Sequence, residues 1–89
     1  MVRVNFTANI QRHVSAPGFE AGGGTLRAVL EEVFAVEPAL RGYVLDDQES
    51  LRKHVTVFID GVQIADRRGL SDLCADGSEV WVMQALSGG

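Results

Sequence analysis

"TLRAVLEEVFAVEP", Thr25–Pro38, is the stretch that decides the fold. Thr25 is suited to cap a helix, because its hydroxyl can accept from a free backbone N–H of the first turn. Pro38 marks a point by which that helix must have ended. We therefore predict one long helix over residues 25–36, with a single apolar stripe. The stripe follows the spacing i, i+3, i+4, i+7, i+8 and consists of Leu26, Val29, Leu30, Val33 and Phe34.

Strand patterns stand on both sides of this helix. "VRVNFTA" (2–8) alternates apolar and polar residues, and "IQRHVSA" (10–16) follows it as the second strand of a predicted hairpin. After the helix, "HVTVFID" (54–60) alternates in the same way, and the Asp-Gly pair at 60–61 turns the chain into "VQIA" (62–65). "EVWVMQA" (79–85) is the last predicted strand, after a short helical turn and loop in "LSDLCADG" (70–77).

The predicted order ββαβββ favours an α+β fold, a ubiquitin-like β-grasp. We expect a mixed sheet of about five strands with one long helix packed on one face. We expect the domain to span residues 1–86 and residues 87–89 to form a flexible Ser-Gly-Gly tail. The strand residues expected to meet the helix are Val2, Val4, Phe6, Val57, Ile59, Val80 and Val82.

Composition restricts the function. With 89 residues, 46% of them apolar, and a net charge of −4, the chain is one small globular domain. Its basic residues are scattered, so nucleic acid is not an expected partner. Cys74, the only cysteine, is interpreted as a small core residue. Because it cannot form a disulfide within the chain, we expect a reducing, cytoplasmic setting. No apolar run approaches the ~20 residues of a membrane helix.

Catalytic patterns are absent from the sequence. It contains no triad, no paired-carboxylate site and no zinc-like spacing of His and Cys, so we expect neither catalytic residues nor a metal site. His13 and His54 are interpreted as structural positions beside strands. The glycines at 22–24 are interpreted as a flexible turn, since no Gly-Lys-Ser/Thr sequence follows them.

The element order, "VTVFIDG" (55–61), "ADGSEVWV" (75–82) and the terminal "SGG" (87–89) together resemble the MoaD/ThiS family of ubiquitin-like sulfur carriers. The resemblance implies that an enzyme similar to the ubiquitin-activating enzymes uses ATP and magnesium to adenylate the Gly89 carboxylate. A sulfur donor would then convert it to a thiocarboxylate. Ser87 and Gly88 would complete the arm, and the chain itself would bind no cofactor and act as a carrier rather than an enzyme.

The sulfur acceptor stays open at this point. It could belong to a cysteine-synthase-like enzyme, a molybdopterin synthase large subunit or a thiazole synthase. The long connection "ALRGYVLDDQESLRKHVTVFIDG" (39–61) resembles the cysteine-type carriers more than the short thiamine-type ones, and a loop of this length also occurs in molybdopterin-type carriers. Two other classes also stay open: a protein modifier that joins Gly89 to target lysines, and a plain binding module whose Ser-Gly-Gly end is incidental.

The tail has physical properties of its own. Residues 85–89 extend about 17 Å at ~3.3–3.6 Å per residue, enough to carry a carboxylate into a partner's crevice. Gly88 and Gly89 allow the backbone to enter a channel too narrow for side chains.

A docking face is predicted on the side of the sheet away from the helix. Strand alternation places Phe58, Trp81 and Met83 on that side, and Leu86, at the start of the tail, is expected to join them. Alternatively, the 41–53 connection folds over them and makes a second small core. Acidic side chains that could assist docking to a basic partner are Asp46, Asp47, Asp76 and Glu79.

Overall fold

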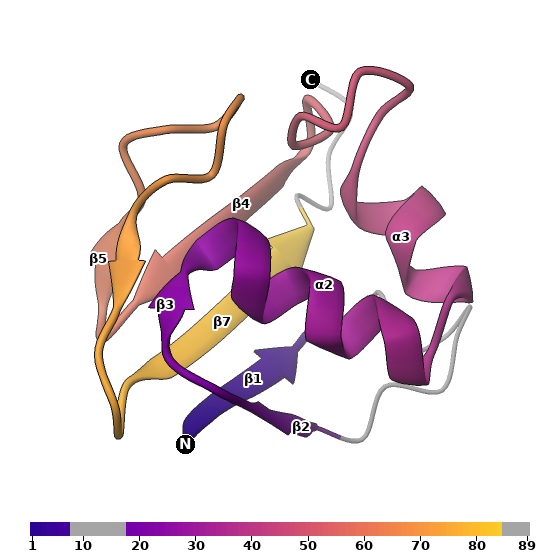
Figure 1. Cartoon of the computed structure of the whole chain (residues 1–89). Coiled ribbons are helices and arrows are strands. Elements are labelled where there is room, and N and C mark those ends of the chain that lie inside the picture. The colour runs from indigo at the N-terminus through magenta and orange to yellow at the C-terminus, as the bar shows by residue number, and fades with distance from the viewer. Residues whose placement is uncertain (8–17, 85–89) are drawn as a thin grey trace.

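The computed structural model describes residues 1–7 and 18–84, and one five-stranded sheet dominates it (Figure 1). The strand order is β2-β1-β7-β4-β5, with β1 and β7 parallel and the other neighbours antiparallel. Helix α2 lies across one face, which confirms the predicted α+β β-grasp. The elements are β1 (Val2–Phe6), β2 (Phe19–Ala21), β3 (Gly24–Thr25), α2 (Leu26–Val36), α3 (Ala39–Val44), β4 (Val55–Ile59), β5 (Val62–Gln63), β6 (Leu73–Cys74) and β7 (Glu79–Gln84).

Helix α2 begins and ends where its sequence predicts. The Thr25 hydroxyl accepts from the backbone N–H of Ala28 at 3.2 Å, and the Glu37 N–H bonds the Val33 carbonyl at 2.9 Å. The predicted stripe is the buried face of the helix. A local pattern of caps and apolar spacing was therefore sufficient to place this element.

The core lies between α2 and the inner face of the sheet. Alternate residues of β1, β4 and β7 point into it, as the period-two pattern predicts. Ile59 packs against this cluster but is only partly buried, since it lies next to the turn into the edge strand β5. The fully or nearly buried residues of β1, β4 and β7 are Val2, Val4, Phe6, Val55, Val57, Val80 and Val82.

The Asp60-Gly61 turn is confirmed, and Asp60 has a second function. Both residues have positive φ, 51° and 83°, which is the requirement of a type I′ hairpin turn. The Asp60 carboxylate accepts from the Glu79 backbone N–H at 2.9 Å and from the Ser78 hydroxyl at 2.8 Å. These hydrogen bonds hold the pKa of Asp60 below its ordinary value and tie the turn to the start of β7.

The N-terminal pair of strands differs from expectation. The strand predicted over residues 10–16 lies outside the described residues, and β1 pairs instead with Phe19–Ala21, with Val4 opposite Phe19. Ala21 is buried, and the Phe19 ring meets Phe6 edge-on with centroids 6.0 Å apart. Three residues beside a glycine run carry too little periodicity to predict a strand; the pairing depends on contact with β1.

The predicted helical turn in residues 70–77 is wrong. Leu73–Cys74 forms β6, which pairs with β3 as a separate two-stranded sheet. The preceding residues satisfy the start of α2: the N–H groups of Leu26 and Arg27 donate to the carbonyls of Asp72 and Leu70, at 2.8 and 2.9 Å. This segment is extended because it satisfies free N–H groups of a helix distant in sequence.

Cys74 lies in the core, as predicted. Its thiol is buried, and burial raises the pKa of this group above its ordinary value. A buried thiol with a raised pKa is a poor nucleophile, which supports its interpretation as a small apolar residue.

The 39–54 connection contains a helix that the sequence did not predict. α3 (Ala39–Val44) starts directly after Pro38, and Leu40 and Val44 are buried. Leu45 and Leu51 form an isolated bridge and also enter the main core. A pattern of six residues that includes Gly42 is too short to predict a helix from the sequence. Burial of Leu40 and Val44 in the core stabilises α3 instead.

Candidate functional site

Strand β7 lies at the centre of the sheet. The candidate site lies at and beside the C-terminal end of this strand, at Gln84. Strand β7 runs parallel to β1 and antiparallel to β4, with Gln84 opposite Val55 (Figure 1). The Thr7 N–H donates to the Val82 carbonyl at 3.1 Å. β7 therefore ends at the edge where β1 also ends and β4 begins. The predicted arm, Ser87, Gly88 and Gly89, lies outside the described residues, as does the predicted docking residue Leu86 that precedes it.

The other three predicted docking residues lie on the outer face. Phe58 is directly opposite Trp81 across β4 and β7, and Met83 is opposite Thr56 one pair further along. Side chains of directly opposed residues lie on the same face and contact each other. The structure thus brings Phe58, Trp81 and Met83 together into one cluster, called here the outer apolar cluster.

Trp81 is the most exposed member of the outer apolar cluster. It retains 37% of its surface, whereas Phe58 and Met83 are partly buried. Its indole Nε1–H donates to the Glu79 carboxylate at 2.8 Å, so the ring is oriented before any partner arrives. The cluster is bordered by polar residues of the same face, namely Asn5, Thr56, Gln63 and Glu79.

The alternative of a second core over this face does not hold for the described residues. Val44, Leu45 and Leu51, the buried apolar side chains of the 41–53 connection, all enter the main core. Buried apolar residues of the described chain form one cluster on the α2 side. The outer apolar cluster therefore remains the predicted docking face.

The acidic candidates lie in two places, at the start of β7 and on the loop after α3. Glu79 starts β7, and Asp76 precedes it, where its carboxylate accepts from the Met1 amino group. That cation holds the pKa of Asp76 below its ordinary value. Asp46 is used locally, as it accepts from the N–H groups of Gln48 and Ser50. Asp47 is exposed on the same loop.

A basic turn, missed by the sequence interpretation, lies at the end of the sheet where β7 ends. The Val55 N–H donates to the Arg52 carbonyl at 3.0 Å, which makes Lys53 and His54 the exposed central residues of a β-turn. Because Val55 pairs with Gln84, this turn stands beside the end of β7. The adjacent basic residues 52–54 were the available signal, but their position depends on strand register.

The turn is held firmly by Arg52. Its N–H and its guanidinium donate to the carbonyls of Val44 and Gly42, at 3.0 and 2.6 Å. Its own carbonyl also accepts from the Arg67 guanidinium at 2.8 Å. These bonds join the turn to α3 and to the loop after β5, so its backbone has little freedom.

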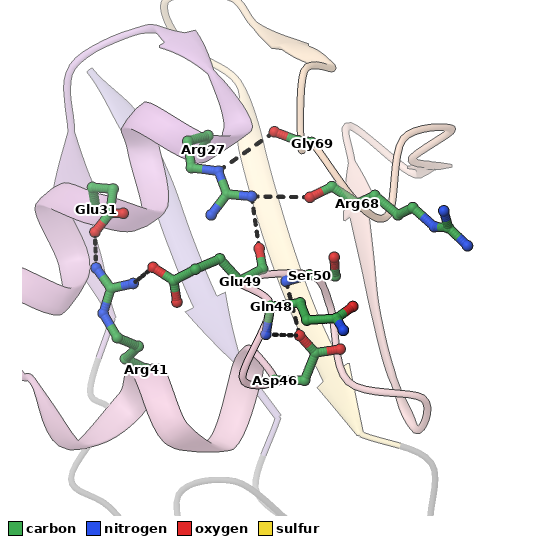
Figure 2. A network of polar contacts seen from close by, with 9 residues as sticks. All are labelled: Arg27, Glu31, Arg41, Asp46, Gln48, Glu49, Ser50, Arg68 and Gly69. Atoms are coloured by element: carbon green, nitrogen blue, oxygen red, sulfur yellow. Dashed lines mark hydrogen bonds and ion pairs between the residues drawn. The ribbon is translucent and has the colours of Figure 1, made fainter.

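Two arginines fasten the neighbouring loops to the helices (Figure 2). The Arg27 guanidinium donates to the carbonyls of Glu49 and Arg68, at 2.6 and 2.9 Å, and so joins two loops to the start of α2. Arg41 of α3 pairs with Glu31 of α2 and with Glu49, the second at 2.6 Å. Figure 2 shows both guanidinium groups converging on the 46–50 loop, which leads into the basic turn.

Within residues 1–7 and 18–84, no group of three or more His, Cys, Asp or Glu side chains could hold a metal ion. Over the same residues, no helix is long and apolar enough to cross a membrane. The outer apolar cluster and the basic turn both adjoin β7.

A mixed sheet with one helix packed across it, and with the last strand of the chain's described part at its centre, is the architecture of ubiquitin-like proteins. The model of the ThiS family matches residues 4–89, and the chain belongs to this family. Among curated proteins, none matches the chain.

Solved structures support the same fold. CysO of Mycobacterium tuberculosis is similar at a TM-score of 0.81 and 22% identity, over 97% of this chain and 100% of that one. The BexX/CysO complex of Amycolatopsis orientalis contains a chain that is similar at a TM-score of 0.83 and 21% identity, over 100% of this chain and 100% of that one. The small archaeal modifier protein 1 of Methanosarcina acetivorans is similar at a TM-score of 0.80 and 26% identity, over 99% of this chain and 95% of that one.

Proposed function

We propose that this chain is a sulfur carrier whose Gly89 carboxylate is adenylated and then converted to a thiocarboxylate. Membership of the ThiS family over residues 4–89 is the observation that supports this most strongly. The structure is consistent with it, because β7 is the central strand, pairs with both β1 and β4, and is the last described element before residues 85–89. The domain serves as a handle for a reactive end, and we place it in the cytoplasm.

The chemistry asks little of the carrier itself. A carboxylate becomes a good electrophile only when it gains a leaving group, here AMP from ATP bound with magnesium in an activating enzyme. A sulfur donor then displaces AMP and leaves a thiocarboxylate on Gly89. The carrier's contribution is to position this end, so we assign it no catalytic residue and no bound cofactor.

Docking to the activating enzyme involves the outer apolar cluster and Leu86. An exposed tryptophan, oriented by Glu79 and flanked by Phe58 and Met83, matches the composition of interface hot spots. Fully extended, residues 85–89 would span about 17 Å, enough to bring the Gly89 carboxylate into the partner's crevice. Ser87, Gly88 and Gly89 are assigned to entry into the catalytic channel.

Intact-mass measurement tests the proposal. The full chain is incubated with an activating enzyme of the family, ATP, magnesium and a sulfide source, beside a reaction without ATP. The expected product is heavier than the starting chain by the difference between sulfur and oxygen, and fragmentation places that difference on Gly89. Unchanged mass, although the enzyme modifies its own carrier under the same conditions, would contradict the carrier function.

A second candidate is a protein modifier. The similarity to a small archaeal modifier protein is the observation that favours it. Adenylation is common to both functions, and only the acceptor differs: sulfur in one, a lysine amine of a target protein in the other. Recovery of tagged chain from its native cells separates them, because covalent adducts on other proteins indicate conjugation and a thiocarboxylate indicates carriage.

The acceptor enzyme is proposed to be of the cysteine-synthase-like class. The similarity in fold to two CysO proteins supports this choice over a molybdopterin synthase large subunit, and both over a thiazole synthase. The thiocarboxylated chain should transfer sulfur to an activated serine in the presence of such an enzyme. Transfer only to a molybdopterin precursor would assign the chain to the other pathway.

A further inference from the structure

The basic turn of residues 52–54 is joined by a basic side chain from another segment. Arg67, on the loop after β5, donates from its guanidinium to the Arg52 carbonyl at 2.8 Å. This bond places the Arg67 charge beside the peptide that leads to Lys53. Lys53 and His54 are both exposed. These four side chains, Arg52, Lys53, His54 and Arg67, are called the basic surface.

The permanent cations of the basic surface, Arg52, Lys53 and Arg67, form no ion pair within residues 1–7 and 18–84. The ion pairs of that part of the chain belong to the Met1 amino group and to Arg41. The guanidinium groups of Arg52 and Arg67 donate to backbone carbonyls instead, which carry no net charge. Like charges without a carboxylate partner in the described chain therefore stand together on a protein whose net charge is −4.

The carboxylates of the neighbouring loops are engaged by other groups. Asp66 accepts from a hydroxyl and from backbone N–H groups of its own loop, and Asp46 also accepts from N–H groups of its loop. Glu49 pairs with Arg41. Asp47 is exposed and forms no ion pair in the described part of the chain. The fold thus leaves the basic surface available to carboxylates of another molecule.

The basic surface is continuous with the outer apolar cluster. The basic turn leads directly into β4, where Val55 pairs with Gln84 and Thr56 with Met83 of the cluster. With strands about 4.8 Å apart and ~3.3 Å per residue along them, the Cα atoms of Lys53 and Gln84 are on the order of 10 Å apart. An apolar centre with a polar, solvated rim is the usual anatomy of a protein–protein interface. A partner seated on the cluster therefore meets the basic surface at its rim.

We propose that the basic surface docks against a carboxylate-rich surface of the activating enzyme, at the rim of the contact made by the outer apolar cluster. This inference rests on the proposed function and adds the charge of the enzyme's side of that contact. It reverses the sign expected from the sequence, in which acidic side chains of this chain meet a basic partner. Rim charges act mainly on the rate of encounter, because they attract the partner before contact.

Association kinetics without ATP test the inference on the full chain, with the activating enzyme of the intact-mass measurement as the partner. Lys53 is exposed and makes no contact that Lys53→Gln would break within the described chain. At about 10 mM ionic strength, where the Debye length is about 30 Å, this variant should associate roughly threefold more slowly, and Lys53→Glu roughly tenfold. Both differences should shrink at about 150 mM ionic strength, and dissociation rates should change little.

Val36→Glu is the matched control, because it shifts the net charge of the chain by the same amount as Lys53→Gln. Val36 is 72% exposed at the end of α2, on the side of the sheet away from the outer apolar cluster. Its association rate should stay near wild type. Lys53→Arg keeps the charge in place and should also associate at the wild-type rate.

A carbodiimide cross-link identifies the contact directly. The reagent joins a carboxylate to an amine that touches it, with loss of water, and Lys53 is the only lysine of the chain. The complex should yield a peptide in which the Lys53 ε-amine is joined to an Asp or Glu of the enzyme. Lys53→Arg should lose this link while it keeps the association rate, because the guanidinium retains the charge but not the reactive amine.

Four results would overturn the inference: no binding of the wild-type chain to the enzyme, unchanged or faster association of Lys53→Glu, equal slowing by Val36→Glu and Lys53→Gln, or cross-links through Met1 without any through Lys53. Adenylation is measured separately by intact mass, so the two proposals fail independently. A chain that binds through Lys53 but is never adenylated contradicts the proposed function alone. Normal adenylation of a Lys53→Glu chain that also binds at the wild-type rate contradicts this inference alone.

Discussion

Asp66 organises a whole loop with one carboxylate. It accepts from the Ser71 hydroxyl at 2.6 Å and from the backbone N–H groups of Gly69 and Arg68, at 2.8 and 3.2 Å. Hydrogen bonds from Ser71 first, and then from Gly69, lower its pKa from 3.8 to about 2. The loop it closes carries the Arg68 and Gly69 carbonyls that receive Arg27.

Replacing Asp66 by Asn should reduce stability in a pH-dependent manner. A carboxyl whose pKa is lower in the folded chain stabilises it above the unfolded pKa, near 3.8, and this stabilisation is lost as pH falls through about 2. Thermal unfolding should therefore show a lower Tm for Asp66→Asn at pH 7. The difference from wild type should shrink between pH 4 and pH 2.

Asp47→Asn is the matched control for this measurement, since it removes the same charge from an exposed side chain. Its Tm should follow wild type across the range. A constant difference between Asp66→Asn and wild type down to pH 2 would contradict the role given to the ionised Asp66.

Trp81 permits a separation of docking from stability. Because it lies on the outer face with 37% of its surface exposed, Trp81→Ala should cost little stability compared with the ~3–5 kcal/mol of a buried aromatic. The same change should weaken activation by the partner enzyme, by at least ~2 kcal/mol of binding if Trp81 is a hot spot. Adenylation rates against carrier concentration, beside thermal unfolding, measure both effects.

Val62→Ala is the control for Trp81, because Val62 is also an exposed apolar residue, at 69%, but lies on the edge strand β5. It should leave adenylation unchanged. Equal effects of the two variants on adenylation would place the partner elsewhere on the sheet.

At the scale of elements, α2 depends on the Thr25 cap and on β6. The Thr25 hydroxyl satisfies the Ala28 N–H, while carbonyls just before β6 satisfy Leu26 and Arg27. The helix start is thus completed by residues far away in the sequence. This explains why a sequence pattern predicted α2 but not the segment that satisfies its start.

Thr25→Ala should destabilise the domain by about 1 kcal/mol, because it leaves one N–H of the first turn without its acceptor. Chemical denaturation should show a lower midpoint with an unchanged slope. Thr25→Ser retains the hydroxyl and should recover most of the loss. If Thr25→Ser is as unstable as Thr25→Ala, methyl packing rather than the cap is responsible.

At the scale of the whole molecule, the buried residues of the described chain form one core. The proposed function assigns Gly89 to chemistry and not to packing. On that proposal Gly89→Ala should leave the Tm unchanged, yet it should greatly reduce adenylation because a side chain then has to enter the channel. Thermal unfolding and ATP-dependent activation of the same preparation test both points; an equal loss of stability would make the tail structural.

The sequence by itself determined α2, the inner faces of β1, β4 and β7, and the Asp60-Gly61 turn, because periodicity, capping and positive φ are local properties of the chain. It also indicated the family through the combination of element order and terminal glycines. The tertiary structure decided β2, β3, β6 and α3, which are short elements stabilised by partners distant in sequence. It also decided the placement of Lys53 beside the end of β7, because strand register brings residues 55 and 84 together and no local pattern records that pairing.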